Sequence, residues 1–396
     1  MTRRIDADVI IVGGGLVGAS AALALRRAAV RVVLLERDVC GAAASGINFG
    51  GVRRQGRPLC QLPLAMRAHR IWANLPRLIG TDGEYVRSGH FKIGRSEADM
   101  ASLERYRQST RDFDLALDML SGSSLRRRAP WLGAEAVGGS LCPEDGHANP
   151  RVVAPAFAWA ARNRGAHVFE HAPVELPEHD GRQFVVASPV AGIEARAPVL
   201  INAAGAWSGP LAERFGESFP LTSGQPAMAV TEPVPQFLPW SLGVEGGGFY
   251  CRQVARGNVV MGGGDGYLSA GAGTRVAGST FLALMGKAAR LLPALSGATV
   301  IRTWSGYEAY LPDRLPILGF SPSTPGLIHA FGFSGAGFQI APAVGEVLAE
   351  LVRDGRTTTP IEAFDANRFS KAQASSCGPV TPDDALATAS ALPTTS

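Results

Sequence analysis

Residues 8–36 read DVIIVGGGLVGASAALALRRAAVRVVLLE and have the clearest pattern of local structure in the chain. The segment Asp8–Val12 is apolar after its first residue, as in a strand that a parallel sheet buries on both faces. A glycine-rich turn follows, then an Ala/Leu-rich helix over Leu16–Ala28 and a second apolar strand over Arg31–Leu35. This order predicts a βαβ unit.

The turn between the first strand and the helix has the spacing G-x-G-x-x-G, with Gly13, Gly15 and Gly18. The first glycine permits the tight turn, the second lets the backbone approach a pyrophosphate, and the third lets helix and strand pack closely. The pyrophosphate would meet the positive end of the helix. Glu36 ends the second strand, where a carboxylate can accept hydrogen bonds from ribose hydroxyls. A glycine-rich surface turn explains none of these coincidences, so the segment predicts dinucleotide binding, by FAD or NAD.

The composition restricts the number of domains, the class of ligand and the cellular compartment that we expect. A chain of 396 residues with 46% hydrophobic content is long enough for two domains. A net charge of +4 with scattered arginines argues against nucleic-acid binding. The five cysteines form no CxxC pair, which excludes a recognisable zinc or iron–sulfur motif and favours a reducing compartment. No signal peptide fits the N-terminus and no apolar stretch is long enough to span a membrane, so we expect a cytoplasmic protein.

Further elements follow from periodicity and turn signals. Helical spacing covers residues 66–76, 98–120, 152–164 and 339–352, and strands are expected at 166–169, 183–187, 199–202 and 327–330. Residues 249–263 predict a hairpin that turns at Arg256-Gly257-Asn258. Residues 371–396 are rich in Ala, Ser, Thr and Pro, which predicts a disordered tail.

Four later segments carry further motifs: the small-residue stretch Cys40–Gly46 with Gly50-Gly51, the sequence NAAGAWS at 202–208, residues 304–319 with Trp304-Ser305-Gly306, and the glycine-rich segment 332–342. In this order, and together with the first turn, they resemble the motifs of the D-amino-acid oxidase superfamily of FAD enzymes. That family includes glycine and sarcosine oxidases, D-amino-acid dehydrogenases and subunits of opine and proline dehydrogenases. The similarity extends to about Arg353 and favours FAD over NAD.

The resemblance implies an α/β fold with two domains. One is a Rossmann-like FAD-binding domain that is discontinuous in sequence, and the other is an α+β substrate domain built on an antiparallel sheet. We expect the FAD-binding domain at 1–85, 148–222 and 303–370, and the substrate domain at 86–147 and 223–302.

The resemblance also implies the residues that contact FAD, which we expect to be bound noncovalently because no residue marks a covalent link. They are Gly13, Gly15, Leu16, Val17, Gly18, Glu36, Arg37, Ala44, Ser45, Gly51, Val174, Ala204, Gly205, Trp207, Gly306, Gly332, Phe333, Gly335, Ala336, Gly337, Phe338 and Gln339. The last helix, with Pro342 expected in its first turn, would direct its positive end at the flavin and stabilise negative charge on the reduced ring.

Removal of hydride from the carbon beside an amine nitrogen depends more on the position of the substrate at the flavin than on acid–base groups. We therefore expect the substrate site to consist of residues that orient the substrate. Arg53 is the candidate for flavin or substrate contact, because related enzymes place an Arg near the flavin face. Its neighbours Arg54 and Arg57 could help to clamp a carboxylate, although Arg54 could instead form a structural salt bridge. Tyr250 matches a pocket tyrosine of related oxidases, with strand packing as the alternative.

Glu308 departs from the family pattern, because glycine oxidase and D-amino-acid oxidase carry a carboxylate-binding Arg at this position. Either the substrate carboxylate turns toward Arg53, or the substrate presents a cation or hydroxyl to Glu308. A third interpretation is that Glu308 pairs with Arg302 or Arg314 and never meets substrate.

These observations predict FAD-dependent oxidation of the C–N bond of an amino acid, an N-substituted or cyclic amino acid, or an opine-like amine, giving an imine. The electron acceptor would be O₂, a quinone or a partner subunit. The alternative is an FAD-bearing subunit of a multi-subunit dehydrogenase that is inactive alone. The C-terminal motif disfavours a third possibility, an oxidoreductase of α-hydroxy acids or glycerol phosphate.

Overall fold

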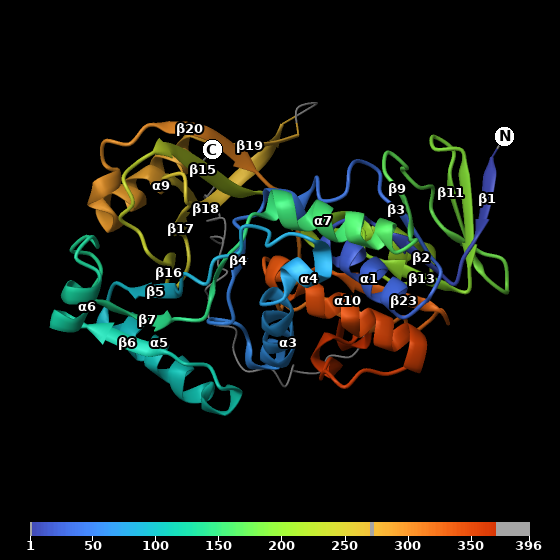
Figure 1. The fold of residues 1–396 in the computed structure, drawn as a ribbon, viewed down its shortest axis with the longest axis horizontal. Helices are drawn as coiled ribbons and strands as arrows, with labels where there is room; N and C mark the ends of the chain where they lie inside the picture. The colour runs from blue at the N-terminus through green and yellow to red at the C-terminus, as the bar shows by residue number, and fades with distance from the viewer. Residues whose placement is uncertain (1, 270–272, 370–396) are drawn as a thin grey trace, which may run out of the picture. The chain divides into compact units, whose positions relative to one another are not determined.

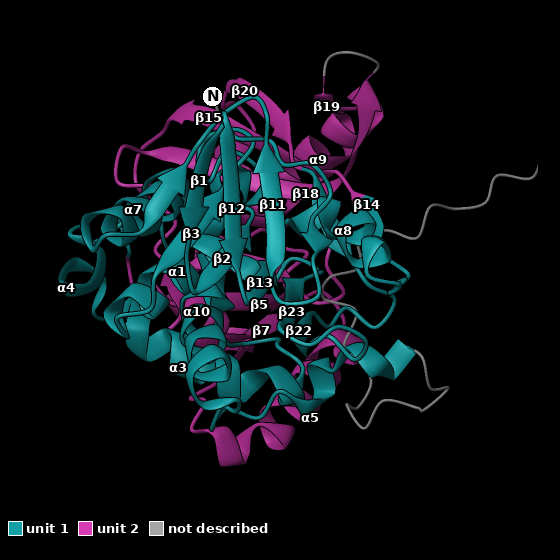
Figure 2. Cartoon of the chain, turned by 90° about the vertical axis from the view of Figure 1, so that its right-hand side faces the viewer, with its two compact units in different colours: residues 1–85, 148–223, 307–379 teal, residues 86–147, 224–306, 380–396 magenta. Residues whose placement is uncertain are grey.

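The computed structural model describes residues 2–269 and 273–369, and these fall into two compact units (Figure 2). Unit 1 comprises residues 2–85, 148–223 and 307–369, and unit 2 comprises residues 86–147, 224–269 and 273–306. The predicted tail at 371–396 lies outside the described residues. The assignment of cofactor binding to one unit and substrate binding to the other stays a prediction.

Unit 1 is built on a six-stranded sheet whose strand order is β22-β23-β13-β2-β3-β9. The strands are β2 (Val9–Val12), β3 (Val32–Leu35), β9 (His167–Phe169), β13 (Val199–Asn202), β22 (Ile317–Phe320) and β23 (Leu327–Phe331). All neighbours are parallel except β22 and β23, which pair antiparallel. The predicted βαβ unit is thus confirmed, and its strands gain neighbours from segments far along the chain.

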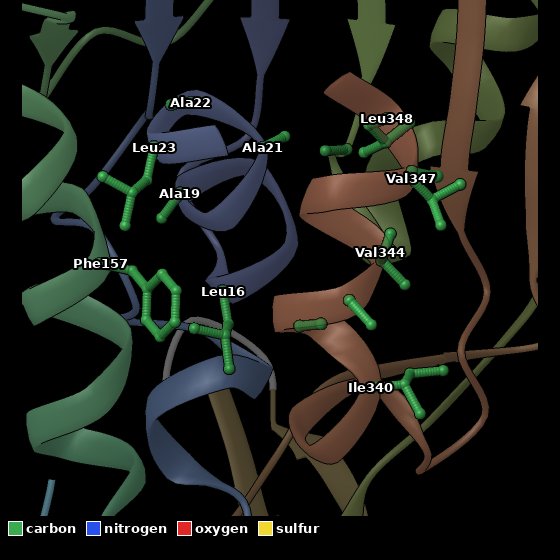
Figure 3. Close-up of a cluster of buried hydrophobic side chains, with 14 of the residues drawn as sticks. Leu16, Ala19, Ala21, Ala22, Leu23, Phe157, Ile340, Val344, Val347 and Leu348 are labelled. Atoms are coloured by element: carbon green, nitrogen blue, oxygen red, sulfur yellow. The ribbon is translucent and has the colours of Figure 1, made fainter. Parts of the chain in front are cut away.

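Four helices of unit 1 pack together beside this sheet: α1 (Leu16–Arg27), α3 (Leu62–Trp72), α7 (Pro150–Asn163) and α10 (Gly337–Asp354). Figure 3 shows α1 between Phe157 of α7 and the apolar side chains Ile340 and Val344 of α10. The backbones of α1 and α10 approach so closely that a Cβ added at Gly345 would lie 2.5 Å from the carbonyl carbon of Ser20. Gly345 on α10 therefore lets this helix pack directly on the backbone of α1, the helix that follows the first glycine turn.

A second sheet of unit 1 has the order β1-β12-β11-β10. Its strands are β1 (Arg3–Asp6), β12 (Ile193–Ala197), β11 (Phe184–Ser188) and β10 (Glu178–His179). The sequence predicted β11 and missed β1, which pairs parallel with β12. Charged residues fill β1, and only Ile5 of that strand is buried, so it carries little of the apolar periodicity that marks a strand.

Unit 2 contains an extended, mostly antiparallel sheet with the path β20-β15-β18-β17-β16-β5-β7-β6, and β19 pairs with β18. The strands are β5 (His90–Gly94), β6 (Asp118–Ser121), β7 (Gly138–Cys142), β15 (Pro226–Pro233), β16 (Ser241–Val244), β17 (Tyr250–Gln253), β18 (Asn258–Ser269), β19 (Gly273–Val276) and β20 (Val300–Ser305). The predicted hairpin is confirmed, since β17 and β18 pair antiparallel across residues 254–257. The helices α6 (Gly122–Arg128) and α9 (Gly278–Leu291) contribute Leu125, Leu284 and Ala288 to the apolar core of this unit.

The predicted helix over 98–120 is wrong in its second half. Helix α5 (Glu97–Ser109) ends there, Asp114 adopts φ 49°, and the chain enters β6. Leu120 is buried as a strand residue, so its apparent helical spacing was coincidental. The predicted helix over 66–76 is likewise divided into α3 and α4 (Leu75–Ile79), because Pro76 fits only the first turn of a helix. Among the described residues, none of the helices has the length and apolar character needed to cross a membrane.

Candidate active site

The backbone of the turn between β2 and α1 shows why each of its three motif positions is occupied by glycine. Gly13 has φ 108°, and a Cβ there would lie 2.3 Å from the carbonyl oxygen of Ala203. A Cβ at Gly18 would lie 2.0 Å from the carbonyl oxygen of Gly13, so this glycine is needed for close packing. A Cβ at Gly15 would meet only the Oγ of Ser45, at 3.0 Å. The space above Gly15 is therefore open to a ligand, as the pyrophosphate of FAD requires.

The N-terminus of α1 offers a site for an anion. Gly15 is the N-cap and has no side chain to cap the helix, and no acidic residue lies in the first turn. Ser45, in the short helix α2 (Ala44–Ile47), accepts a hydrogen bond from the Leu16 N–H at 2.8 Å. The positive end of the helix thus carries no negative side chain and can bind a phosphate group.

Two backbone donors hold the carboxylate of Glu36 at the end of β3. The N–H of Gly14 donates to its Oε2 at 2.6 Å, and the N–H of Asp38 donates to its Oε1 at 2.9 Å. A carboxylate has about four lone-pair directions, so it can accept ribose hydroxyls as well. The position and orientation of Glu36 fit the predicted ribose contact.

Trp207, in the NAAGAWS segment, stacks with the side chains of Arg37 and Tyr307 on the surface of unit 1. The guanidinium carbon of Arg37 lies 3.5 Å from the ring centroid of Trp207, and the rings of Trp207 and Tyr307 are 5.2 Å apart. Gly205 has φ 58°, and a Cβ there would meet no atom within 4 Å. Ala204 packs with Val174 against the same apolar cluster. This stack joins Arg37 and Trp207, which are 170 residues apart in sequence and were each predicted to contact FAD.

The second glycine-rich segment leads into α10. Gly332 has φ 73° and lies against Leu311, and Ser334, which is buried, has φ 49°. The N-cap of α10 is Ala336, and its first turn contains no acidic residue, so this helix end can also stabilise a negative charge. The expected place of Pro342 is wrong. The helix begins at Gly337, so Pro342 is its sixth residue and lies in the second turn.

Two residues expected at the flavin direct their side chains to α3 instead. The ring of Phe338 lies 5.2 Å from that of Trp72, and the amide nitrogen of Gln339 donates to the carbonyl of Ala65 at 2.9 Å. The indole N–H of Trp72 in turn donates to the carbonyl of Gln339 at 2.7 Å. Contact of these two residues with FAD would therefore use the backbone.

The three arginines after Gly51 differ in their surroundings. Arg53 is half-buried, and its guanidinium donates to the carbonyl of Gln55 at 2.6 Å. Arg54 and Arg57 are each only 3% exposed, and the Nε of Arg57 donates to the carbonyl of Arg53 at 3.4 Å. Gly51 itself lies against the ring of Phe49. Arg53 is thus the most accessible guanidinium of this group.

Glu308 begins the short strand β21 (Glu308–Tyr310), where it accepts a hydrogen bond from the hydroxyl of Tyr310 at 2.8 Å. The guanidinium of Arg314 lies 4.9 Å from the centre of the Tyr310 ring. Tyr310 therefore contacts Glu308 through its hydroxyl and Arg314 through its ring. Gly306 lies at the other end of the motif, in unit 2, where its N–H donates to the carbonyl of Pro226.

One face of the unit 2 sheet is polar, in contrast to the other. Phe91, Leu242 and Cys251 belong to the apolar core, so the residues that alternate with them point to the opposite face. We call this opposite side the polar sheet face; it carries His90, Lys92, Ser241, Tyr250 and Arg252. Its strands can be followed in Figure 1. Tyr250 was predicted as a pocket residue and Arg252 was not, although alternation along Tyr250-Cys251-Arg252 places both on one face.

Two glycines let large side chains lie flat across the polar sheet face. A Cβ at Gly262 would be 2.5 Å from the Tyr250 ring, and a Cβ at Gly243 would be 3.2 Å from the Nε2 of His90. The hydroxyl of Tyr250 lies 3.3 Å from the sulfur of Met228. These contacts fix the position of the tyrosine, so the strand-packing alternative for Tyr250 has a structural basis beside the functional one.

A buried ion pair occupies one end of this face. The Nζ of Lys92 lies 2.6 Å from the Oε2 of Glu245, and the hydroxyl of Ser102 on α5 donates to its Oε1 at 2.5 Å. Both charged side chains are at least 94% buried. Removing either partner would leave an uncompensated buried charge, so Lys92 has a structural role here.

His147 is buried in unit 2, within electrostatic range of Arg252. Its Nδ1 is 3.1 Å from the hydroxyl of Ser241 and 3.3 Å from that of Ser88. Burial, reinforced by the positive charge of Arg252, lowers the pKa of His147 from 6.5 to about 3. The imidazole therefore stays neutral near pH 7 and can exchange hydrogen bonds with these hydroxyls.

This pKa predicts a loss of stability on acidification. Between pH 6.5 and 3 the unfolded chain binds a proton at His147 and the folded chain does not, so the free energy of unfolding falls as the pH falls. The contribution is at most about 1.4 kcal/mol per pH unit. Urea titrations at pH 7, 6 and 5 should show a shallower pH dependence for His147→Gln than for the unchanged protein. Equal slopes would contradict the prediction.

Comparison with known proteins identifies the family. The family model described as FAD dependent oxidoreductase matches residues 8–351. The chain belongs to this family. It is 29% identical to an opine oxidase subunit of Rhizobium meliloti over 93% of this chain and 99% of that protein. It is 30% identical to glycine oxidase of Geobacillus kaustophilus over 93% of this chain and 98% of that protein. The crystal structure of L-proline dehydrogenase from P. horikoshii shares the fold, with a TM-score of 0.85 at 24% identity over 93% and 99% of the two chains.

These findings confirm the family resemblance, the mixed α/β fold and the dependence on FAD. The chain is an FAD-dependent oxidoreductase. The individual contacts with FAD, and the roles of Arg53, Tyr250 and Glu308, stay predictions that the geometry above makes specific.

Proposed function

We propose that this family member oxidises the C–N bond of a small amine that also bears a carboxylate: an amino acid, an N-substituted or cyclic amino acid, or an opine. FAD, when bound, supplies the acceptor for the hydride that leaves the carbon beside the nitrogen. The names of two relatives, an opine oxidase subunit and a glycine oxidase, support this substrate class.

The observation that carries the proposal is the pair Tyr250 and Arg252 on the polar sheet face. A guanidinium can bind a carboxylate through two parallel hydrogen bonds, and a neighbouring tyrosine hydroxyl can orient a second group. Arg252 is 6% exposed, so an ion pair formed there is screened less than one at the surface. We assign to it the carboxylate-binding role that Glu308 cannot perform.

Anaerobic mixing of the holoenzyme with candidate substrates tests the proposal. The panel contains amino acids, N-methyl amino acids, cyclic amino acids and opines, with 2-hydroxy acids and glycerol phosphate as controls. Bleaching of the flavin absorption band near about 450 nm is expected only with carboxylate-bearing amines. Bleaching by the hydroxyl compounds alone would assign the protein to the other class of oxidoreductase.

A second candidate function is an FAD-bearing subunit of a larger dehydrogenase, which the name of the opine oxidase subunit supports. The same experiment distinguishes the two when it is repeated in air. An independent oxidase forms peroxide with the substrate that bleached its flavin. A subunit that is inactive alone neither bleaches its flavin with any substrate of the panel nor forms peroxide until its partner subunit is added.

Substitutions of Arg53 and Glu308 test how these residues divide substrate selection. If Glu308 holds a cation or hydroxyl of the substrate, Glu308→Gln should reduce kcat/KM for substrates that have this group and spare those that lack it. If Arg53 holds a carboxylate, Arg53→Ala should raise KM for dicarboxylate substrates by about 30-fold or more. Steady-state kinetics on one good substrate and one truncated analogue measures both effects. Equal, small effects on both substrates would make Glu308 a structural partner of Tyr310.

A further inference from the structure

A groove of about 450 Å³ lies on unit 1, apart from the segments expected to bind FAD. It is lined by five arginines: Arg27, Arg67, Arg70, Arg77 and Arg164. They come from the last residue of α1, from α3, from α4 and from the C-cap of α7. The glycine turn lies at the opposite end of α1, which is about 18 Å long at 1.5 Å per residue. The groove is therefore a separate site.

One of the five arginines is already neutralised and fixed in place. The guanidinium of Arg67 donates to Glu346 at 3.0 Å, to Glu350 at 2.6 Å and to Thr359 at 2.9 Å. A guanidinium nitrogen of Arg27 lies 3.8 Å from the Oε1 of Glu346, and Arg67 contacts the Oε2 of the same carboxylate. The carboxylates of Glu346 and Glu350 thus provide the counter-charge for the guanidinium groups of Arg27 and Arg67.

The other three arginines have no acidic partner within the described parts of the chain. No carboxylate there lies within 4.0 Å of the guanidinium of Arg70, Arg77 or Arg164, and all three side chains are exposed. Glu346, the acidic residue that lines the groove, pairs with Arg67 and Arg27, so the other three guanidinium groups repel one another and an anion bound between them relieves that repulsion.

The rest of the groove suits a small molecule. Its volume is within the range of about 300–1,000 Å³ that is typical of small-molecule sites. Ile71 and Leu78 provide an apolar surface, and Asn74 provides an amide that can donate and accept hydrogen bonds. Arginines bind phosphates and carboxylates in bidentate geometry.

We infer that this groove binds a small multivalent oxyanion, a phosphate ester or a polycarboxylate, through Arg70, Arg77 and Arg164. The simpler explanation is that basic side chains merely complement the negative ends of α1, α3 and α7. That explanation predicts general salt effects and no saturable binding, so the two can be separated.

Titration calorimetry on the FAD-saturated protein tests the inference, because bound FAD blocks its own pyrophosphate site. The probes are pyrophosphate, citrate and acetate at matched ionic strength. We expect saturable binding of pyrophosphate, citrate or both with Kd below about 1 mM, and none of acetate. Binding of pyrophosphate alone would assign the site to phosphate compounds, and binding of citrate alone to polycarboxylates. Absence of saturable binding by either probe would overturn the inference.

Two double variants locate the site. Arg70→Ala with Arg77→Ala should weaken binding about tenfold for each guanidinium removed. Arg151→Ala with Arg182→Ala removes the same charge from exposed positions of unit 1 outside the groove, and should leave Kd within about twofold. Equal weakening in both variants would show a general charge effect and overturn the assignment. All four side chains are exposed, so neither variant should disturb folding.

Discussion

Gly15→Val should yield a folded protein that binds FAD more than about 100-fold more weakly than the unchanged chain, equivalent to about 2.7 kcal/mol. Gly15 has φ −65° and ψ 176°, an extended conformation that valine adopts without strain. A side chain there would meet only Ser45 within the protein and would fill the space that a pyrophosphate needs. The loss should therefore be specific to the cofactor.

The measurement is the absorbance ratio of flavin to protein after purification, together with a titration of the apoprotein with FAD. Gly297→Val is the matched control, since Gly297 is exposed in unit 2 and a Cβ there meets nothing within 4 Å. Normal FAD affinity in Gly15→Val would show that the pyrophosphate lies elsewhere. An unfolded Gly15→Val protein, judged by circular dichroism, would show that the turn needs this glycine for its own structure.

Arg252→Met should reduce kcat/KM for carboxylate-bearing substrates by about 30- to 1,000-fold, which corresponds to about 2–4 kcal/mol. The variant keeps much of the apolar stem of arginine and removes the charge. A substrate analogue that lacks the carboxylate should react equally with both proteins, because it never used the guanidinium. The comparison of the two substrates separates lost binding from altered folding.

Arg302→Met provides a matched control. Arg302 lies on β20 and pairs in register with Val230 on β15, and Val230 pairs with Val260, the partner of Arg252. The two arginines thus occupy one row of the sheet, but Arg302 is exposed. It should change kcat/KM by less than about threefold. An equal loss in both variants, or an equal loss with both substrates, would contradict the role proposed for Arg252.

The glycine turn between β2 and α1 and the carboxylate of Glu36 were predictable from sequence because their structural requirements are local. Gly13, Gly15, Gly18 and Glu36 lie within one βαβ unit, and each has a separate steric or hydrogen-bonding reason to be there. The spacing of the motif is therefore enough to assign each of these residues to its place in the βαβ unit. The match of the family model over residues 8–351 agrees with this interpretation of the motifs.

The polar sheet face was harder to predict because its residues come from strands that are distant in sequence. Lys92 and Tyr250 share a row only because β16 pairs with both β5 and β17. Strand register is set by turns and packing, which a single sequence does not reveal. The ion pair of Lys92 with Glu245 and the burial of His147 within electrostatic range of Arg252 depend on that register, so neither could be inferred beforehand.

The strand order of unit 1 also determines when this protein can complete its fold on the ribosome. Strands β2 and β3 are synthesised first, but β13 reaches its place beside β2 only after about residue 202, and β23 only after residue 331. Until α10 emerges, the side of α1 that contains Ser20 has no helix against it. The second segment of unit 2, residues 224–306, is translated before α10. Unit 2 can therefore fold while the sheet of unit 1 is still incomplete and exposes apolar surface. Slow translation before residue 337 would prolong this exposure and increase the demand for chaperones.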